Sequence, residues 1–177
     1  KRIPQTNIEW EVRRYQEALR LTYEDLTKTQ SNAQELFGKN FAKLMAAHKL
    51  ILQDPILVQG VIDKIKKEHI NAEYALFLVV QEVNTTFEQI KDEFFRERKF
   101  DIADVSKRLY DHLTNKQQNT FASIKEPSVV VAHNLFPSDT IHLKRKSVLG
   151  FATDIGGKTS HTALLAQTIQ MPAVVGL

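Results

Sequence analysis

A glycine-rich loop with a histidine carries the clearest chemistry in the sequence. It runs Asp154-Ile-Gly-Gly-Lys-Thr-Ser-His-Thr-Ala-Leu-Leu-Ala166. Gly156 and Gly157 can adopt backbone angles closed to other residues, so several N–H groups can converge on one point. Thr159 or Ser160 can cap a helix that follows. The free N–H groups and the dipole at such a helix start attract an anion, typically phosphate.

His161 falls in the first turn of that expected helix, and this position indicates nucleophilic chemistry. The positive end of a helix opposes protonation, which favours the neutral and nucleophilic imidazole. After accepting a phosphoryl group, the side chain would be an anion in a site built for anions. We therefore interpret His161 as a candidate for a phosphorylated intermediate in covalent catalysis.

A glycine turn followed by a surface histidine would explain the same composition. The loop lacks the spacing of a Walker phosphate loop. No second histidine and no carboxylate cluster stands at metal-ligand spacing around it. The loop is therefore a candidate for phosphoryl chemistry through histidine, without a predicted metal.

The elements that must position this loop fall into two regions with different sequence patterns. Up to about residue 125, apolar residues recur at three- and four-residue steps, the spacing of amphipathic helices. Short connections between the stripes indicate an antiparallel helical bundle. We expect five helices: one with its apolar stripe from Val12 to Leu26, one from Leu36 to Leu52, one starting at Asp54-Pro55, one capped by Asn71 and one capped by Asp101.

From residue 126 the pattern changes to short β-branched runs. The runs Ser128–Ala132, Ser147–Ala152 and Ala173–Gly176 predict strands, and Thr159 to about Ile169 predicts a helix. Strands alternating with helices favour parallel pairing. The predicted fold is therefore a mixed α+β and α/β one. It has a helical bundle subdomain over residues 1–125 and a partial α/β subdomain over 126–177, whose thin core suggests a piece of a larger protein.

Composition excludes several classes of protein. The 177 residues include 24 Lys and Arg against 21 Asp and Glu, too small an excess to indicate nucleic acid as a partner. The absence of cysteine excludes disulfide scaffolds and thiol catalysis, and it fits a reducing compartment. The longest apolar run, Ala75–Val80, is far short of the ~20 residues of a membrane helix, and no signal peptide follows Lys1. We expect no nucleic-acid or membrane partner.

The loop and the strand after it closely resemble the phosphohistidine signature of phosphoenolpyruvate-utilising enzymes. The matching residues are Gly156–Ala166 and Met171–Gly176, with supporting stretches at Phe136–Thr140 and Val148–Asp154. Within that superfamily, the sequence is most similar to Enzyme I of the bacterial sugar phosphotransferase system. The resemblance extends over nearly the whole chain, and its specific motifs lie in the α/β region.

The resemblance implies a phosphoryl relay. By this resemblance, His161 accepts phosphate from phosphoenolpyruvate and passes it to a histidine of a small phosphocarrier protein, HPr. The threonine that matches Thr140 hydrogen-bonds near the imidazole. Residues at the start of the helix would stabilise the transferring group, namely Lys158, Thr159 and Ser160.

The resemblance also implies partners and a location. A carrier-binding face on the helical region is matched by His48, Leu50, Ile51 and Leu57. Phosphoenolpyruvate and Mg²⁺ are implied to bind a C-terminal barrel outside this chain, so no cofactor is expected here. The barrel normally supplies the dimer contact, which implies a homodimeric full-length enzyme and a monomeric fragment. The implied location is the cytoplasm.

Two positions differ from the family pattern, which usually has arginine at both. Lys158 keeps the charge but loses the planar two-pronged donor, and Gln167 loses the charge. Two alternative functions stay open, and Gln167 supports the second of them. One is a phosphohistidine domain of the pyruvate phosphate dikinase or phosphoenolpyruvate synthase type, and the other is a non-catalytic relative that only binds the carrier.

Overall fold

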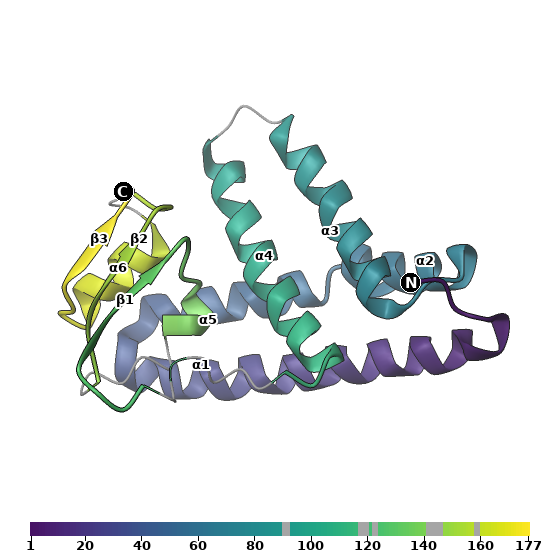
Figure 1. The fold of residues 1–177 in the computed structure, drawn as a ribbon, viewed down its shortest axis with the longest axis horizontal. Coiled ribbons are helices and arrows are strands. Elements are labelled where there is room, and N and C mark those ends of the chain that lie inside the picture. The colour runs from purple at the N-terminus through teal and green to yellow at the C-terminus, as the bar shows by residue number, and fades with distance from the viewer. Residues whose placement is uncertain (90–92, 117–120, 122–123, 141–146, 158–159) are drawn as a thin grey trace. The chain divides into compact units, whose positions relative to one another are not determined.

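The protein is mostly helical with a small parallel sheet, which confirms the predicted fold class. A computed structural model describes residues 1–89, 93–116, 121, 124–140, 147–157 and 160–177 (Figure 1). The chain divides into two compact units: Lys1–Gln30 with Lys43–Lys116, and Ser31–Ala42 with Gln117–Leu177. The predicted boundary at residue 125 places residues 31–42 in the helical subdomain, whereas the two compact units group them with residues 117–177.

The helices of the first unit account for most of its residues. After a 3-10 turn, η1, the helix α1 is continuous where the sequence predicts two separate helices. No glycine or proline interrupts the polar residues 27–32 between the two apolar stripes, so nothing there ends the helix. The bounds are η1 Gln5–Asn7, α1 Ile8–Leu52, η2 Ile56–Gly60 (a π-helix), α2 Val61–Glu68, α3 Ala72–Glu88 and α4 Glu93–Leu113.

Although continuous, α1 doubles back on itself (Figure 1). Along a straight helix Asp25 and His48 would lie about 34 Å apart, at ~1.5 Å per residue. Both nevertheless contact one turn of α4, where Arg108 binds Asp25 at 2.6 Å and Asp104 lies 3.7 Å from His48. The two predicted stripes therefore form two arms of one helix, residues 8–30 and 43–52, within the first unit.

The predicted helix starts have different outcomes. The Asp54 carboxylate accepts a hydrogen bond from the Ile56 N–H at 2.8 Å, which confirms the predicted start there. Asn71 occupies the N-cap position of α3, as predicted, but its side chain does not cap the helix. Its side-chain oxygen instead accepts a hydrogen bond from the N-terminal ammonium of Lys1 at 2.7 Å. The capping prediction for Asp101 is wrong, because α4 begins at Glu93 and Asp101 lies inside it. There its carboxylate is engaged by His48, 3.3 Å away, an interaction that its sequence neighbours do not reveal.

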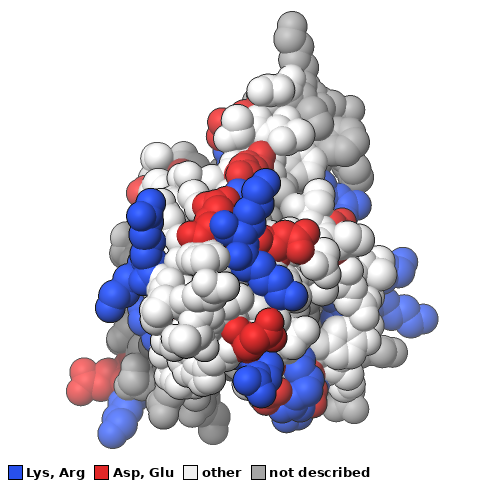
Figure 2. All heavy atoms as spheres, turned by 90° about the vertical axis from the view of Figure 1, so that its right-hand side faces the viewer, with Lys and Arg blue, Asp and Glu red and all other residues white. Residues whose placement is uncertain are grey.

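Polar anchors join the helices around an apolar core. Arg14 of α1 makes a two-pronged ion pair with Glu73 of α3, at 2.6 and 2.7 Å, and donates to the Leu113 carbonyl at the end of α4. The Tyr15 hydroxyl donates to the Leu57 carbonyl at 2.7 Å. Acidic and basic side chains are interspersed on the face shown in Figure 2. Fully buried core side chains include Leu26, Met45, Val61, Ile65, Val105 and Leu109.

The second unit contains the sheet. Its strands are β1 (Ser128–Ala132), β2 (Val148–Thr153) and β3 (Ala173–Val175), all parallel and in the order β1-β2-β3. The predicted strands and their parallel pairing are confirmed. Two helices, α5 (Pro137–Thr140) and α6 (His161–Thr168), follow β1 and β2. Because parallel strands end at one edge of a sheet, the segments after all three strands meet there.

None of the helices within the described residues is long and apolar enough to cross a membrane.

Candidate functional site

The glycine loop leaves the carboxyl edge of the sheet through β2. The N–H of Ile155 donates to the His133 carbonyl at 3.0 Å, so the loop begins by pairing with the segment after β1. The hydroxyl of the buried Thr153 donates to the Ile155 carbonyl at 2.8 Å. Near the other end, the Ser160 N–H donates to the Gly157 carbonyl at 3.0 Å. These bonds fix the loop where it leaves β2 and where it enters α6.

Only one of the two predicted loop glycines uses its special freedom. Gly156 has φ +134°, and a Cβ built there would lie 3.2 Å from Cβ of Val175. Gly157 has no positive φ, and a Cβ there would meet no atom within 4 Å. Sequence reasoning missed a third glycine, Gly176, which has φ +75° and approaches the Gly156 carbonyl so closely that a Cβ would lie 2.8 Å from it. The end of β3 therefore packs directly on the loop.

The start of α6 follows the prediction at Ser160 and His161. Ser160 is the N-cap, with its hydroxyl accepting a hydrogen bond from the Ala163 N–H at 3.3 Å. His161 is the first residue of the helix. Lys158 and Thr159 lie outside the described residues, as do the side chains of Thr140 and His161. The hydrogen bond expected between Thr140 and the imidazole therefore stays a prediction.

Thr162 ties α6 to the segment after β1. Its buried hydroxyl donates to the Leu135 carbonyl at 2.6 Å. Leu135 precedes α5, and α5 packs against α6. Sequence reasoning did not single out Thr162, because a threonine in a first helical turn can equally cap, bond within its helix or face solvent.

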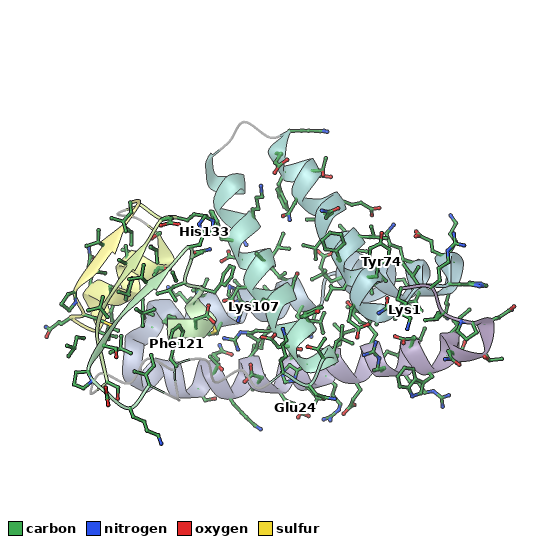
Figure 3. The ribbon with its side chains drawn as sticks, viewed as in Figure 1. Lys1, Glu24, Tyr74, Lys107, Phe121 and His133 are labelled. Atoms are coloured by element: carbon green, nitrogen blue, oxygen red, sulfur yellow. The ribbon has the colours of Figure 1, made fainter. Side chains whose placement is uncertain are left out.

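His133 lies at the same edge of the sheet (Figure 3). Its Nδ1 is 2.9 Å from Oδ2 of Asp154, and both side chains are largely exposed. The pair therefore joins the end of β1 to the end of β2 at the surface, beside the base of the loop.

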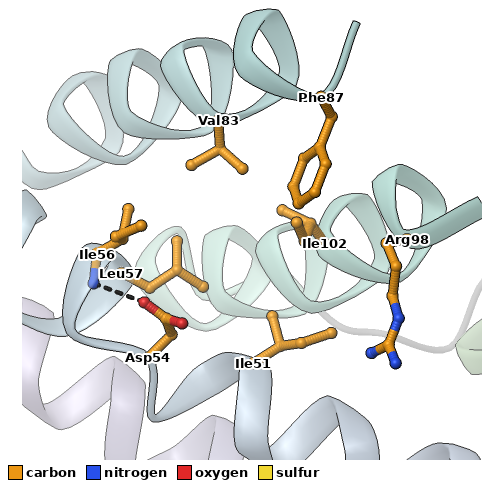
Figure 4. Close-up of a pocket in the computed structure, with 8 residues that line it drawn as sticks. All are labelled: Ile51, Asp54, Ile56, Leu57, Val83, Phe87, Arg98 and Ile102. Carbon is orange, nitrogen blue, oxygen red and sulfur yellow. Dashed lines mark hydrogen bonds between the residues drawn. The ribbon is translucent and has the colours of Figure 1, made fainter. Parts of the chain in front are cut away.

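The first unit has a separate feature, an apolar groove of about 300 Å³ (Figure 4). Val83 and Phe87 enter it from α3, and Ile102 enters it from α4. Two charged residues, Asp54 and Arg98, stand on its lining. The remaining lining residues come from the end of α1 and from η2, namely Ile51, Ile56 and Leu57.

The residues matched to a carrier-binding face take different places in the structure. Ile51 and Leu57 line the groove, Ile51 half-buried and Leu57 buried. Leu50 is 70% exposed and is not on the groove lining. His48 has no exposed surface, so its side chain makes no direct contact with a partner of the folded protein.

His48 instead lies between two carboxylates of α4. Its Nε2 is 3.3 Å from Asp101 and its Nδ1 is 3.7 Å from Asp104, which is itself fully buried. The apolar stripe on which His48 stands faces the interior of the bundle, which is the physical reason for its burial. His48 therefore joins the second arm of α1 to α4, two elements that also supply the groove lining.

Among the described residues, no group of three or more His, Cys, Asp or Glu side chains could hold a metal ion.

Comparison with known proteins gives two family matches and a set of relatives. The family of PEP-utilising enzymes matches by its N-terminal domain over residues 1–98 and by its mobile domain over residues 124–177. A phosphoenolpyruvate-protein phosphotransferase of Staphylococcus aureus is 41% identical, and one of Priestia megaterium is 42% identical. Each alignment covers 97% of this chain and 30% of the relative. The chain thus spans under a third of these relatives' length.

Two solved structures share the fold. The NMR solution structure of Enzyme I (nEIt) protein aligns with a TM-score of 0.78 and 37% identity, covering 100% of this chain and 71% of that one. The N-terminal domain of Enzyme 1 - Nitrogen aligns with a TM-score of 0.69 and 20% identity, covering 96% of this chain and 69% of that one. The second likeness shows the fold alone.

Proposed function

Because this chain belongs to the family of PEP-utilising enzymes, we propose that it relays a phosphoryl group through His161 as part of a phosphoenolpyruvate-protein phosphotransferase. The carrying observation is that His161 is the first residue of α6, directly after a serine N-cap and a glycine loop. The backbone N–H groups at such a start favour an anion. A phosphorylated histidine is an anion at that point.

The proposed step is an in-line displacement at phosphorus. In the exchange with phosphorylated HPr, the donor used in the test below, the lone pair of one imidazole nitrogen of His161 forms a P–N bond while the bond between phosphorus and the HPr histidine nitrogen breaks. The electron pair of the broken bond returns to the donor's nitrogen, and each histidine keeps the proton on its other ring nitrogen. Positioning and electrostatic stabilisation lower the barrier, and we assign these tasks to Ser160 and, by resemblance, to Lys158, Thr159 and Thr140.

We propose that the groove in the first unit binds the carrier protein HPr. Its apolar lining from three helices suits a protein partner, since well-packed apolar anchors carry most of the energy of such interfaces. Asp54 and Arg98 would add polar contacts at its sides. Of the residues matched to the docking face, Ile51 and Leu57 belong to this groove, whereas His48 would act only by supporting it.

Other parts of the reaction are assigned outside this chain. Phosphoenolpyruvate and Mg²⁺ would bind the remainder of the full-length protein, which would also supply its dimer contact. We place the relay in the cytoplasm, in the service of sugar uptake or its regulation, and the absence of cysteine is compatible with that compartment. The relatives named above are phosphoenolpyruvate-protein phosphotransferases, which do not favour the dikinase alternative.

The test uses two phosphoryl donors. We expect phosphorylated HPr to add one phosphoryl group to this chain, detected by intact mass, and phosphoenolpyruvate alone to add none. His161→Ala should abolish the addition, whereas His133→Ala, at the same sheet edge, should leave it intact. Binding of HPr by a wild-type chain that takes no phosphoryl group would instead support the non-catalytic alternative.

A further inference from the structure

The hydroxyl of Thr162 makes a hydrogen bond between two elements of the second unit. Its Oγ1 lies 2.6 Å from the carbonyl oxygen of Leu135, which is 27 residues earlier in the chain. Both residues are buried, with 8% of Thr162 and 3% of Leu135 exposed. Thr162 directly follows His161, so the bond acts on the first turn of α6.

Thr162 makes its hydrogen bond outside its own helix. A threonine hydroxyl in a helix commonly donates to the carbonyl four residues earlier, as Thr168 does to Leu164 at 2.8 Å. Thr162 is the second residue of α6, so no carbonyl of this helix lies four residues before it. Its hydroxyl donates to the segment that follows β1. The branched threonine side chain is stiff about its first torsion. The bond therefore restrains the rotation of α6 about its axis as well as the distance of α6 from the segment after β1.

The restraint matters because of what the two segments carry. The side chains of a helix project outward from its axis. A rotation of the eight-residue α6 about its axis therefore changes the direction in which its first residue, His161, projects. The Leu135 segment continues into α5, whose last residue is Thr140. Ser160, one residue before the helix, already bonds to the Ala163 N–H. The Ser160 cap is a bond within the start of α6, whereas the Thr162 bond holds this helix start to a different segment, the one after β1.

We propose that Thr162 is a positioning residue for phosphoryl transfer: its hydroxyl holds the first turn of α6 against the segment after β1 and thereby sets where His161 meets phosphorus. The inference rests on the proposed function. Small displacements of a reacting group lower rates steeply, by up to about a hundredfold for ~1 Å. Thr162 therefore acts on the rate of transfer and not on carrier affinity.

The test compares matched variants. Thr162→Val removes the hydroxyl at nearly constant shape, and Thr162→Ser keeps it. Thr168→Val removes the exposed hydroxyl bond of the same helix and serves as the control. The readouts are the single-turnover rate of transfer from phosphorylated HPr, the Kd for HPr, and the chemical shifts of the His161 imidazole by NMR.

We expect Thr162→Val to lower the rate about tenfold to a hundredfold, to shift the His161 resonances and to leave the Kd unchanged. Thr162→Ser should restore most of the rate, and Thr168→Val should behave as wild type. If Thr162→Val does not fold, the ratio of rates between Thr162→Ser and Thr162→Ala takes its place. Equal rates with and without the hydroxyl overturn the inference alone, whereas a wild-type chain that accepts no phosphoryl group overturns the proposed function as well.

Discussion

Gly156 adopts a backbone conformation that other residues rarely reach. With φ at +134° and a tight approach to Val175, it leaves no strain-free position for a side chain. Gly157, its neighbour, has open space and no positive φ. Two adjacent glycines of one loop therefore carry different constraints, and only the first is needed for the path of the backbone.

Substitution of each glycine by alanine separates them. We expect Gly156→Ala to lower the free energy of unfolding by about 1–3 kcal/mol, the usual cost of such strain. Gly157→Ala should change it by less than about 1 kcal/mol. Thermal and denaturant unfolding of the two variants measures the difference. Equal losses at both positions would show that the loop follows a different path from the one described.

His48 is a second residue whose surroundings, more than its type, decide its role. Its removal takes away the imidazole that lies 3.7 Å from the buried Asp104 carboxylate, and it weakens the contact between α1 and α4. We expect His48→Ala to lower the free energy of unfolding by about 1–3 kcal/mol, as for the loss of a buried hydrogen-bonding partner. Leu50→Ala, on the same arm but exposed, should change it by about 0.5 kcal/mol or less.

The same two variants distinguish a supporting role of His48 in the fold from a direct contact of His48 with HPr. If His48→Ala weakened HPr binding while leaving the unfolding free energy unchanged, a direct contact role for His48 would replace the supporting one.

At the scale of elements, Arg14 and Glu73 connect α1, α3 and the end of α4. Burial of Glu73 opposes its ionisation, but hydrogen bonds from Arg14 outweigh this effect and hold the pKa of its carboxyl below the ordinary value. The folded protein therefore binds this proton less readily than the unfolded chain. The resulting stability is present at neutral pH and is lost as the pH falls below the ordinary glutamate pKa of about 4.3 and through the lower folded value.

Glu73→Gln tests this linkage. The variant should be less stable than wild type at neutral pH and should lose less stability on acidification, as measured by urea unfolding across that range. Glu17→Gln is the control, because Glu17 pairs with Arg20 on the exposed surface, where such pairs contribute little. A wild-type acid profile in Glu73→Gln would contradict the role given to this ion pair.

Local patterns predicted those elements whose ends depend on nearby residues. The start at Asp54, the cap position at Asn71 and the three strands depend on capping, proline and β-branched runs, which a single stretch of sequence displays. The continuity of α1 and the start of α4 could not be predicted this way. Asp101 has the side chain of a good cap, yet its partner His48 lies 53 residues away in sequence. By local rules Asp101 could either cap a helix or lie inside one, and its contact with the distant His48 accompanies the interior position.

In the candidate site, too, local sequence predicts some features and long-range contacts decide the others. The serine cap and the place of His161 follow from local rules, and both are as predicted. The approach of Gly176 to Gly156 and the bond from Thr162 to Leu135 join segments brought together only by parallel pairing. In the helical region, periodicity places His48 on an apolar stripe, and its side chain is buried accordingly. Leu57 is singled out only by the family resemblance, which did not show that it is buried.

At the scale of the whole molecule, the proposed function separates binding from transfer. The groove lies in the first unit and the glycine loop in the second, so a variant in the groove should affect carrier affinity and leave the chemistry of the loop intact. We expect Phe87→Ala to weaken HPr binding by about tenfold, the scale of an aromatic anchor that a bound partner covers. Isothermal titration calorimetry measures the change.

Phe77→Ala is the matched control for the groove. Phe77 belongs to the same helix, is 50% exposed and does not line the groove. Equal weakening by the two variants would argue against the groove as the carrier site.

The central claim is that a phosphoryl group resides on His161, and NMR of isotope-labelled histidine tests it most directly. On addition of phosphorylated HPr, we predict that the imidazole resonances of His161 alone move to positions typical of phosphohistidine, and that they return when unphosphorylated HPr is added in excess. Phosphorylation of another of the six histidines, or no change at His161 while HPr keeps its phosphoryl group, would contradict the account.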